Sequence, residues 1–158
     1  MLSPRNQSQR RDTANHLGPR DDWHRDHLSA TEEVVPLIET VAAAMNTHGY
    51  PDQDIFGLRL ALEEALINAI KHGHQYDPGK QVSVRYCIRP EHVLVDVQDE
   101  GPGFDPTAVP DATAPENWEC PSGRGMLLMR TYTSWLRYNR QGNGVRLCKY
   151  SSTLQSQD

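Results

Sequence analysis

The chain has 158 residues, of which 37% are hydrophobic, and its formal net charge is −5. This length is enough for one substantial core and predicts a single domain. The acidic balance and the absence of a lysine or arginine cluster in the sequence argue against direct nucleic-acid binding. No apolar run approaches the roughly 20 residues that span a bilayer, so we expect no membrane segment.

The cysteines and the polar ends indicate the compartment and the domain limits. Three cysteines are odd in number and far apart, with neither metal-site nor disulfide spacing: Cys87, Cys120 and Cys148. The first residues also lack the apolar core of a secretory signal, so we expect a cytoplasmic protein. Residues 1–21 and 151–158 are polar and offer nothing to bury. We therefore predict two tails, the first disordered, around a domain at 22–150.

The first elements predicted are a strand and a helix. Trp23–Leu28 is a candidate strand, and Ser29–Glu32 has the spacing of a capping box. Pro36 is tolerated only in a first turn, which allows the regular helix to begin later than this cap. Gly49 and Pro51 then end the helix. Its apolar residues recur at helical intervals: Val34, Val35, Leu37, Ile38, Val41, Ala42 and Met45.

A second helix is predicted from Asp52 or Asp54 to about His72, stopping at Gly73. Its later part is apolar nearly all round, as expected of a helix that is covered on most sides. Within it Glu64, Asn68 and Lys71 fall on one line. Polar groups among leucines and isoleucines are costly to bury unpaired, which favours a crevice with a polar ligand. A solvent-facing stripe is the alternative, and the helix alone does not decide between them.

The periodicity then changes from 3.6 to 2. Gln81–Arg89 and the run Val93, Val95 and Val97 predict two strands joined by a short reversal. Counting on by two places Asp99 on the buried face, at the strand end. The pattern Asp99-x-Gly101-x-Gly103 follows, and its glycines allow the backbone to approach a ligand closely. A strand that ends in a polar turn explains the same residues.

The last third contains a long connection, a helix and a hairpin. Residues 104–122 are rich in proline and have no periodicity, as in a lid or a disordered segment. Ser122–Gly125 leads into a short helix with Met126, Leu127, Met129 and Tyr132 available for packing. Glycines at a helix start expose N–H groups to an anion such as phosphate, although a flexible start with a solvated Arg124 is the alternative. Trp135–Asn139 and Val145–Tyr150 predict a closing hairpin.

The order and spacing of three motifs resemble the N, G1 and G2 boxes of the GHKL ATP-binding superfamily: Glu64-x-x-x-Asn68, Asp99-x-Gly101-x-Gly103 and Gly123-x-Gly125. The sequences EALINAIKHGH and SGRGMLLMR look like the anti-sigma factor serine kinases of bacteria. The resemblance covers roughly residues 23–150. It implies a Bergerat-type α/β sandwich, in which a mixed, mostly antiparallel sheet has its helices packed on one face.

The resemblance also implies the role of each motif residue in binding ATP and Mg²⁺. Glu64 is the expected general base, and Asn68 the expected Mg²⁺ ligand, a hard oxygen donor for a hard ion. Asp99 is expected to accept a hydrogen bond from the adenine amino group, beside close backbone approach at Gly101 and Gly103. The phosphates are expected to bind the amides of Gly123, Arg124, Gly125 and Met126, with the side chains of Arg124 and Lys71 as supplementary charges.

The function implied is a serine/threonine kinase that phosphorylates a STAS-domain anti-anti-sigma protein and sequesters a sigma factor. A homodimer is implied by the resemblance only. One alternative is a nucleotide-gated binding module without phosphotransfer, but pure binding does not need Glu64. Another is an ATP-binding domain in histidine phosphotransfer, and for it no dimerisation helix with a phosphoacceptor histidine is evident.

Overall fold

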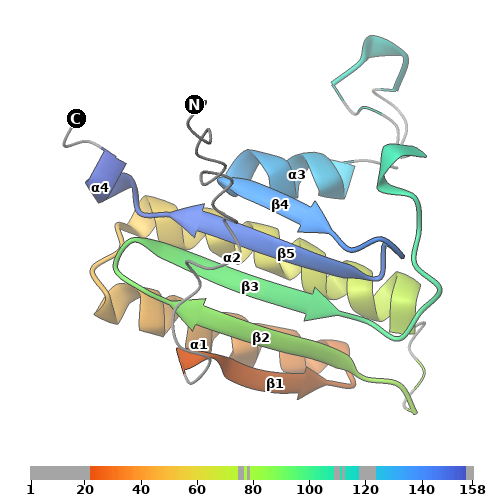
Figure 1. The fold of residues 1–158 in the computed structure, drawn as a ribbon, viewed down its shortest axis with the longest axis horizontal. Coiled ribbons are helices and arrows are strands. Elements are labelled where there is room, and N and C mark those ends of the chain that lie inside the picture. Colours follow the sequence, from red (N-terminus) through yellow and green to blue (C-terminus); the bar gives the residue numbers. More distant parts are fainter. Residues whose placement is uncertain are drawn as a thin grey trace, which may run out of the picture.

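The computed structural model describes residues 22–74, 77, 79–108, 111, 113–117 and 124–155. Its strands form one sheet in the order β1-β2-β3-β5-β4, and all four pairings are antiparallel. The strands are β1 (His24–Leu28), β2 (Val82–Ile88), β3 (His92–Gln98), β4 (Trp135–Tyr138) and β5 (Gly144–Tyr150) (Figure 1). The α/β class is confirmed, although the described strands contain no parallel pair of the kind a mixed sheet would have.

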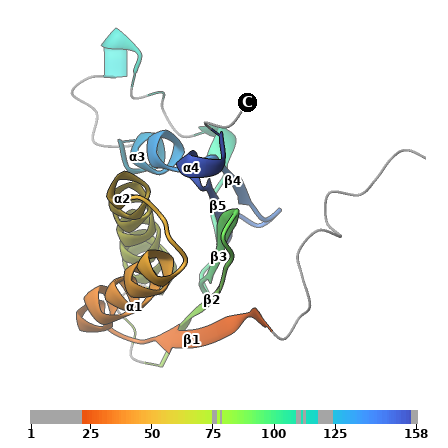
Figure 2. The ribbon, with the colours of Figure 1, turned by 90° about the vertical axis from the view of Figure 1, so that its left-hand side faces the viewer.

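Three helices cover one face of this sheet, and no described helix lies on the other face (Figure 2). They are α1 (Val34–Thr47), α2 (Asp52–Asn68) and α3 (Arg124–Tyr132). The alternating valines of β2 and β3 are buried against them, and the register places Val84 opposite Val97. Burial of alternate apolar side chains on one face therefore positions the sheet on the helices. No helix in the described part of the chain is long and apolar enough to cross a membrane.

The start of α1 differs from the predicted capping box. A 3-10 turn at Thr31–Glu33 precedes the helix, and its N-cap is Ala30, which makes no side-chain cap bond. The Ser29 amide instead donates to Glu33 Oε1 at 3.3 Å, so the carboxylate that reaches back lies one residue later than Glu32. Val35 points outward, with 60% of its surface exposed. Pro36 does lie in the first turn of α1, as predicted.

The end of α2 also differs from the prediction. The α-helix stops at Asn68, and a π-helical segment, Ala69–His74, continues the chain. Gly73 therefore lies inside helical structure and is not the residue that ends it. A π segment changes which side chains share a face, and such segments occur often at functional sites. Asn68, the last residue of α2, stands at this change of helix type.

The C-terminal residues 151–155 belong to the fold, where the sequence predicts a polar tail. Ser151 is buried and its amide donates to Glu91 O at 2.9 Å. Ser152 begins the short helix α4 (Ser152–Gln155), and its amide donates to Asp54 Oδ2 at 2.8 Å. Asp54 is only 3% exposed, so this bond joins α4 to the first turn of α2. Residues 1–21 and 156–158 lie outside the described residues.

We predict that Asp54→Ala lowers the free energy of unfolding by about 1–3 kcal/mol, because it removes the buried, charged acceptor of the hydrogen bond that joins α4 to α2. Urea denaturation measures the change. Asp52→Ala is the matched control, because Asp52 lies in the same helical turn but is exposed. An equal loss in both variants would assign the effect to the helix dipole and contradict the proposed bond.

Candidate functional site

The predicted motifs gather at one end of the molecule. α2 and β3 both end there, α3 begins there, and the turn between β4 and β5 lies at the same end (Figure 1). Asn68, Asp99 and Gly125 come from these three element ends. Segments far apart in the sequence therefore contribute to one region, as the three-motif interpretation requires.

The most direct link between two motifs is the packing of α3 against α2. The helices run antiparallel, with Gly57 facing Tyr132 and Glu64 facing Gly125. A Cβ at position 125 would overlap the carboxylate of Glu64, so a larger residue there would displace the end of the Glu64 side chain from its present position. Arg124 and Gly125 are already the first residues of α3. The Glu64 carboxylate therefore lies beside the N-terminal turn of α3, where amide groups carry partial positive charge.

The remaining residues of the first motif lie near this contact. Glu64 and Asn68 are half-buried, and neither side chain makes a hydrogen bond or ion pair with any described residue. Half-buried polar groups with no protein partner are positioned to bind a polar ligand. Lys71 lies in the π-helical segment and is exposed. Gly123 lies outside the described residues, so its predicted role stays a prediction.

Asp99 follows β3 directly and is half-buried. Its Oδ1 accepts a hydrogen bond from the Gly101 amide at 2.7 Å, which fixes the carboxylate in a turn. Burial raises the pKa of Asp99, while the Gly101 amide and nearby Lys80 act to lower it. The second carboxylate oxygen makes no hydrogen bond among the described residues. It is the group that a ligand N–H would reach.

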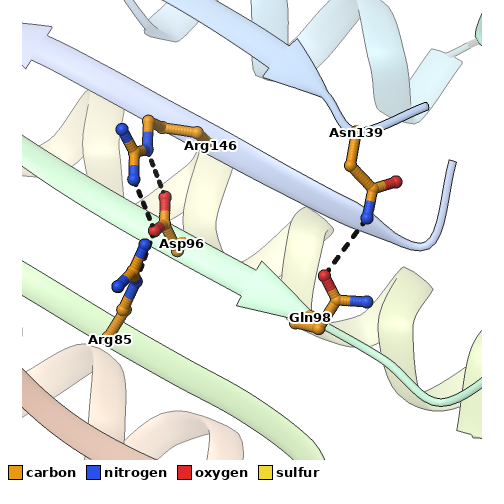
Figure 3. Close-up of polar contacts among 5 residues, drawn as sticks. All are labelled: Arg85, Asp96, Gln98, Asn139 and Arg146. Carbon is orange, nitrogen blue, oxygen red and sulfur yellow. Dashed lines mark hydrogen bonds and ion pairs between the residues drawn. The ribbon is translucent and has the colours of Figure 1, made fainter. Parts of the chain in front are cut away.

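Two hydrogen bonds of Asn143, in the β4–β5 turn, hold this loop, and together they are called the clasp. No sequence pattern predicts them. Asn143 O accepts a hydrogen bond from the Asp99 amide at 2.9 Å, and Asn143 Nδ2 donates to Gly101 O at 3.1 Å. Asn139 supports the clasp by donating to Asn143 Oδ1 at 2.8 Å and to Gln98 Oε1 at 3.2 Å (Figure 3). Asn143 therefore bonds to both ends of the Asp99 turn.

Two glycines allow the loop after β3 and the β4–β5 turn to lie close enough for the clasp to form. Gly103 and Gly142 have φ angles of 80° and 75°, in the left-handed region that favours glycine. A Cβ on Gly103 would overlap Gln141 O, and a Cβ on Gly142 would overlap Phe104 O. The loop after β3 and the β4–β5 turn are thus in backbone contact, which explains why glycine is required on both sides.

Tyr138 connects this loop with the Glu64 region and was also missed by the sequence analysis. It lies in β4, and its ring makes an edge contact with Phe104 at a centroid distance of 5.1 Å. Burial raises the pKa of Tyr138 to about 12, with Arg130 acting to lower it and Glu64 acting to raise it further. Tyr138 is therefore within electrostatic reach of Glu64 while it contacts the first residue after the glycine loop.

The donor set fits a magnesium nucleotide better than a metal bound by protein alone. No group of three or more histidine, cysteine or acidic side chains is arranged to hold a metal within the described residues. Mg²⁺ is usually held by one or two protein oxygens together with substrate phosphates and water. A single amide such as Asn68, one helical turn beyond Glu64, would supply one protein oxygen of that kind.

We predict that Asp99→Asn unfolds at the same or a higher urea concentration than the parent near neutral pH. Because the pKa of Asp99 is raised in the folded state, its ionised form costs stability there, and asparagine keeps the acceptor for Gly101. The difference should shrink as the pH falls through that pKa.

Asp105→Asn is a control of opposite sign, because the Thr107 hydroxyl and amide lower the pKa of Asp105. The stability that its ionised form contributes is present near neutral pH and is lost as the pH falls. That variant should therefore have the lower urea midpoint near neutral pH. A midpoint for Asp99→Asn clearly below the parent would contradict the interpretation of Asp99 as a residue that costs stability.

Comparison with known proteins agrees with this geometry. A family model described as the histidine kinase-like ATPase domain matches residues 28–149. The chain is similar to the serine-protein kinase RsbW of Bacillus subtilis (strain 168), with 30% identity over 139 residues, which cover 82% of this chain and 86% of that protein. RsbW of Oceanobacillus iheyensis is 25% identical over 118 residues, covering 70% and 75%. RsbW of Bacillus cereus (strain G9842) is 24% identical over 131 residues, covering 78% and 81%.

Proposed function

Because the chain belongs to the histidine kinase-like ATPase domain family, and within it to the anti-sigma factor serine kinases, we propose that it transfers phosphate from ATP to a protein serine. The proposed acceptor is a STAS-domain anti-anti-sigma protein, and the proposed second partner is a sigma factor. The observation that carries the proposal is the contact of Gly125 with the Glu64 carboxylate. This contact brings a proton-accepting carboxylate together with a helix N-terminus that would bind phosphate.

The nucleotide is proposed to lie along the end of the sheet where the motifs meet. Asp99 Oδ2 would accept a hydrogen bond from the adenine amino group, while Asp99 Oδ1 accepts the hydrogen bond from the Gly101 amide. Asn68 would ligate Mg²⁺, and the first amides of α3 would bind the phosphates. Arg124 and Lys71 are proposed to add positive charge there. When bound, ATP supplies the phosphoryl group and Mg²⁺ offsets the phosphate charge.

Glu64 is proposed to accept the proton of the acceptor serine hydroxyl. Phosphoryl transfer depends mainly on positioning and electrostatic stabilisation, and a positioned base adds to both by orienting the nucleophile. The carboxylate suits this role because Gly125 leaves room for it at the helix end, and no described residue neutralises it by an ion pair. Tyr138 and the turn before β5 would hold the loop after β3, which contains Asp99, in place relative to the Glu64 carboxylate.

We predict that Glu64→Gln keeps ATP affinity but lowers the rate of phosphate transfer by about 10² to 10⁴. Labelled ATP and STAS-domain proteins of the same organism provide the assay, and acid-stable label identifies phosphoserine. Glu63→Gln is the control, since Glu63 is adjacent and exposed. Asn68→Ala, measured by calorimetry, separates metal binding from base catalysis, because it should weaken Mg²⁺-ATP binding itself.

Four results would count against these roles. An unchanged transfer rate in Glu64→Gln would remove the base assignment, and unchanged Mg²⁺-ATP affinity in Asn68→Ala would remove the metal role. ATP binding with no label on any partner would favour the nucleotide-gated binding module. Acid-labile label would indicate phosphohistidine and a different reaction.

We also predict that Asn143→Ala weakens ATP binding about fivefold and narrows the preference for ATP over GTP. The variant loses one hydrogen bond that holds the Asp99 turn, worth about 1 kcal/mol, and with it the fixed position of the adenine acceptor. Calorimetry with both nucleotides measures the preference. Asn46→Ala, on the exposed end of α1, is the control. A uniform loss of affinity for both nucleotides would indicate a merely structural role.

A further inference from the structure

The sheet face opposite the helices carries a row of arginines that the sequence does not reveal, beside a patch where Cys87, Leu94 and Cys148 are buried. The strand register aligns one residue from each of the five strands, in sheet order: Arg25, Arg85, Asp96, Arg146 and Arg137. Directly paired residues point to the same side of a sheet, so this set forms one line across it. Figure 3 shows its centre in front of the strands, with the helices behind.

The row is strongly positive on an acidic chain. Among described strand residues on this face, the only carboxylate is Asp96, and it is shared by two ion pairs. Arg146 Nε binds Asp96 Oδ1 at 2.5 Å and Arg85 Nε binds Asp96 Oδ2 at 2.6 Å. Arg25 and Arg137 are exposed and have no carboxylate partner among the described residues.

The arrangement costs stability if nothing binds to it. Arg25 lies directly opposite Arg85, and Arg137 lies directly opposite Arg146. Like charges in such cross-strand pairs are destabilising. A fold with four arginines and one aspartate in line is therefore poorly explained by structure alone, whereas carboxylates from a ligand would relieve both repulsions.

Aromatic residues beside the row favour a protein ligand over a nucleic acid. Trp23 lies over Arg85 and Arg146, at 5.0 and 5.6 Å from its ring centroid to the guanidinium carbons, and Arg137 lies 4.8 Å over Trp135. Tryptophan and arginine together are typical of the energetic centres of protein interfaces. The net charge of −5 also opposes a long polyanion more than a short acidic peptide.

Two other possible ligands of the row, the chain's own N-terminal segment and a second copy of the chain, fit it poorly. Residues 1–21 contain four arginines and two aspartates, so the chain's own N-terminal segment is basic and does not complement it. A second copy of the chain on a two-fold axis would place the same arginine row opposite itself. Charge complementarity therefore points to a different, acidic molecule.

We propose that this arginine row is a docking surface for an extended acidic segment of a partner protein. Five strands about 4.8 Å apart make the row about 19 Å long, the length of about six extended residues. Carboxylates toward the two ends of such a segment would reach Arg25 and Arg137, whereas Asp96 already pairs with Arg85 and Arg146 at the centre. The surface lies on the opposite side of the sheet from the helices, so the proposal does not depend on the kinase function.

The probe for the test is a fluorescein-labelled decapeptide of alternating glutamate and serine, with fluorescence polarisation as the readout. The parent chain should bind it, and added salt should weaken the binding. Arg25→Glu and Arg137→Glu should each reduce affinity about fivefold or more. Arg59→Glu, in α2 on the helical side, changes the net charge equally and should leave affinity within about twofold. Urea midpoints confirm that each variant is folded.

Four outcomes would overturn the proposal. The first is no binding of the decapeptide by the parent chain, and the second is an equal loss in Arg59→Glu, which would indicate net charge alone. The third is tighter binding of a duplex DNA oligonucleotide than of the peptide, which would make the row a nucleic-acid surface. The fourth is a change of molecular mass in light scattering for Arg137→Glu, which would assign the face to contact between copies.

Discussion

The close approach of α3 to α2 is the constraint on which the candidate site depends. In the first turn of α3, Gly125 has no side chain, and the Glu64 carboxylate of α2 occupies the space that a Cβ would take. The same packing places Tyr132, the last residue of α3, against Gly57 near the start of α2. Small residues on both helices therefore set the spacing and the register of α2 and α3. A larger residue at position 125 would displace the Glu64 carboxylate from the first amides of α3. The position of the site is thus set by packing, before any ligand is considered.

The loop after β3, which contains Asp99 and Gly101, adds a second constraint, and it is met at some cost to the stability of the fold. Asp99 is held half-buried by hydrogen bonds from a distant turn, and burial raises its pKa. A carboxylate kept ionised in such surroundings weakens the fold at neutral pH, yet it leaves one acceptor oxygen ready for a ligand. Strain of this kind is expected where a site is organised in advance of binding. Asn143 carries much of that organisation, because it bonds to both ends of the Asp99 turn.

Local periodicity was sufficient to predict most elements, since strands and helices bury side chains at their own intervals. Alternating valines located β2 and β3, and counting on by two placed Asp99 correctly at a strand end. The π-helical segment after Asn68 was not predictable, because it depends on how the chain leaves α2 toward β2. Asn143 and Tyr138 were missed for a related reason. Their roles arise from contacts across more than thirty residues of sequence, and nothing next to them in the chain marks those contacts.

The arginine row illustrates the same limit in reverse. The sequence has no lysine or arginine cluster that would predict this row, because the four arginines of the row come from four different strands. Sheet register is a long-range property, and a shift of one residue in any strand would turn that arginine to the helical face. The buried valines on the opposite face oppose such a shift, since it would expose them. The hydrophobic core between the helices and the sheet therefore also holds the arginine row in line. One pattern of alternation thus specifies two separate surfaces, and a partner bound to the arginine row would leave the region around Glu64 and Asp99 accessible.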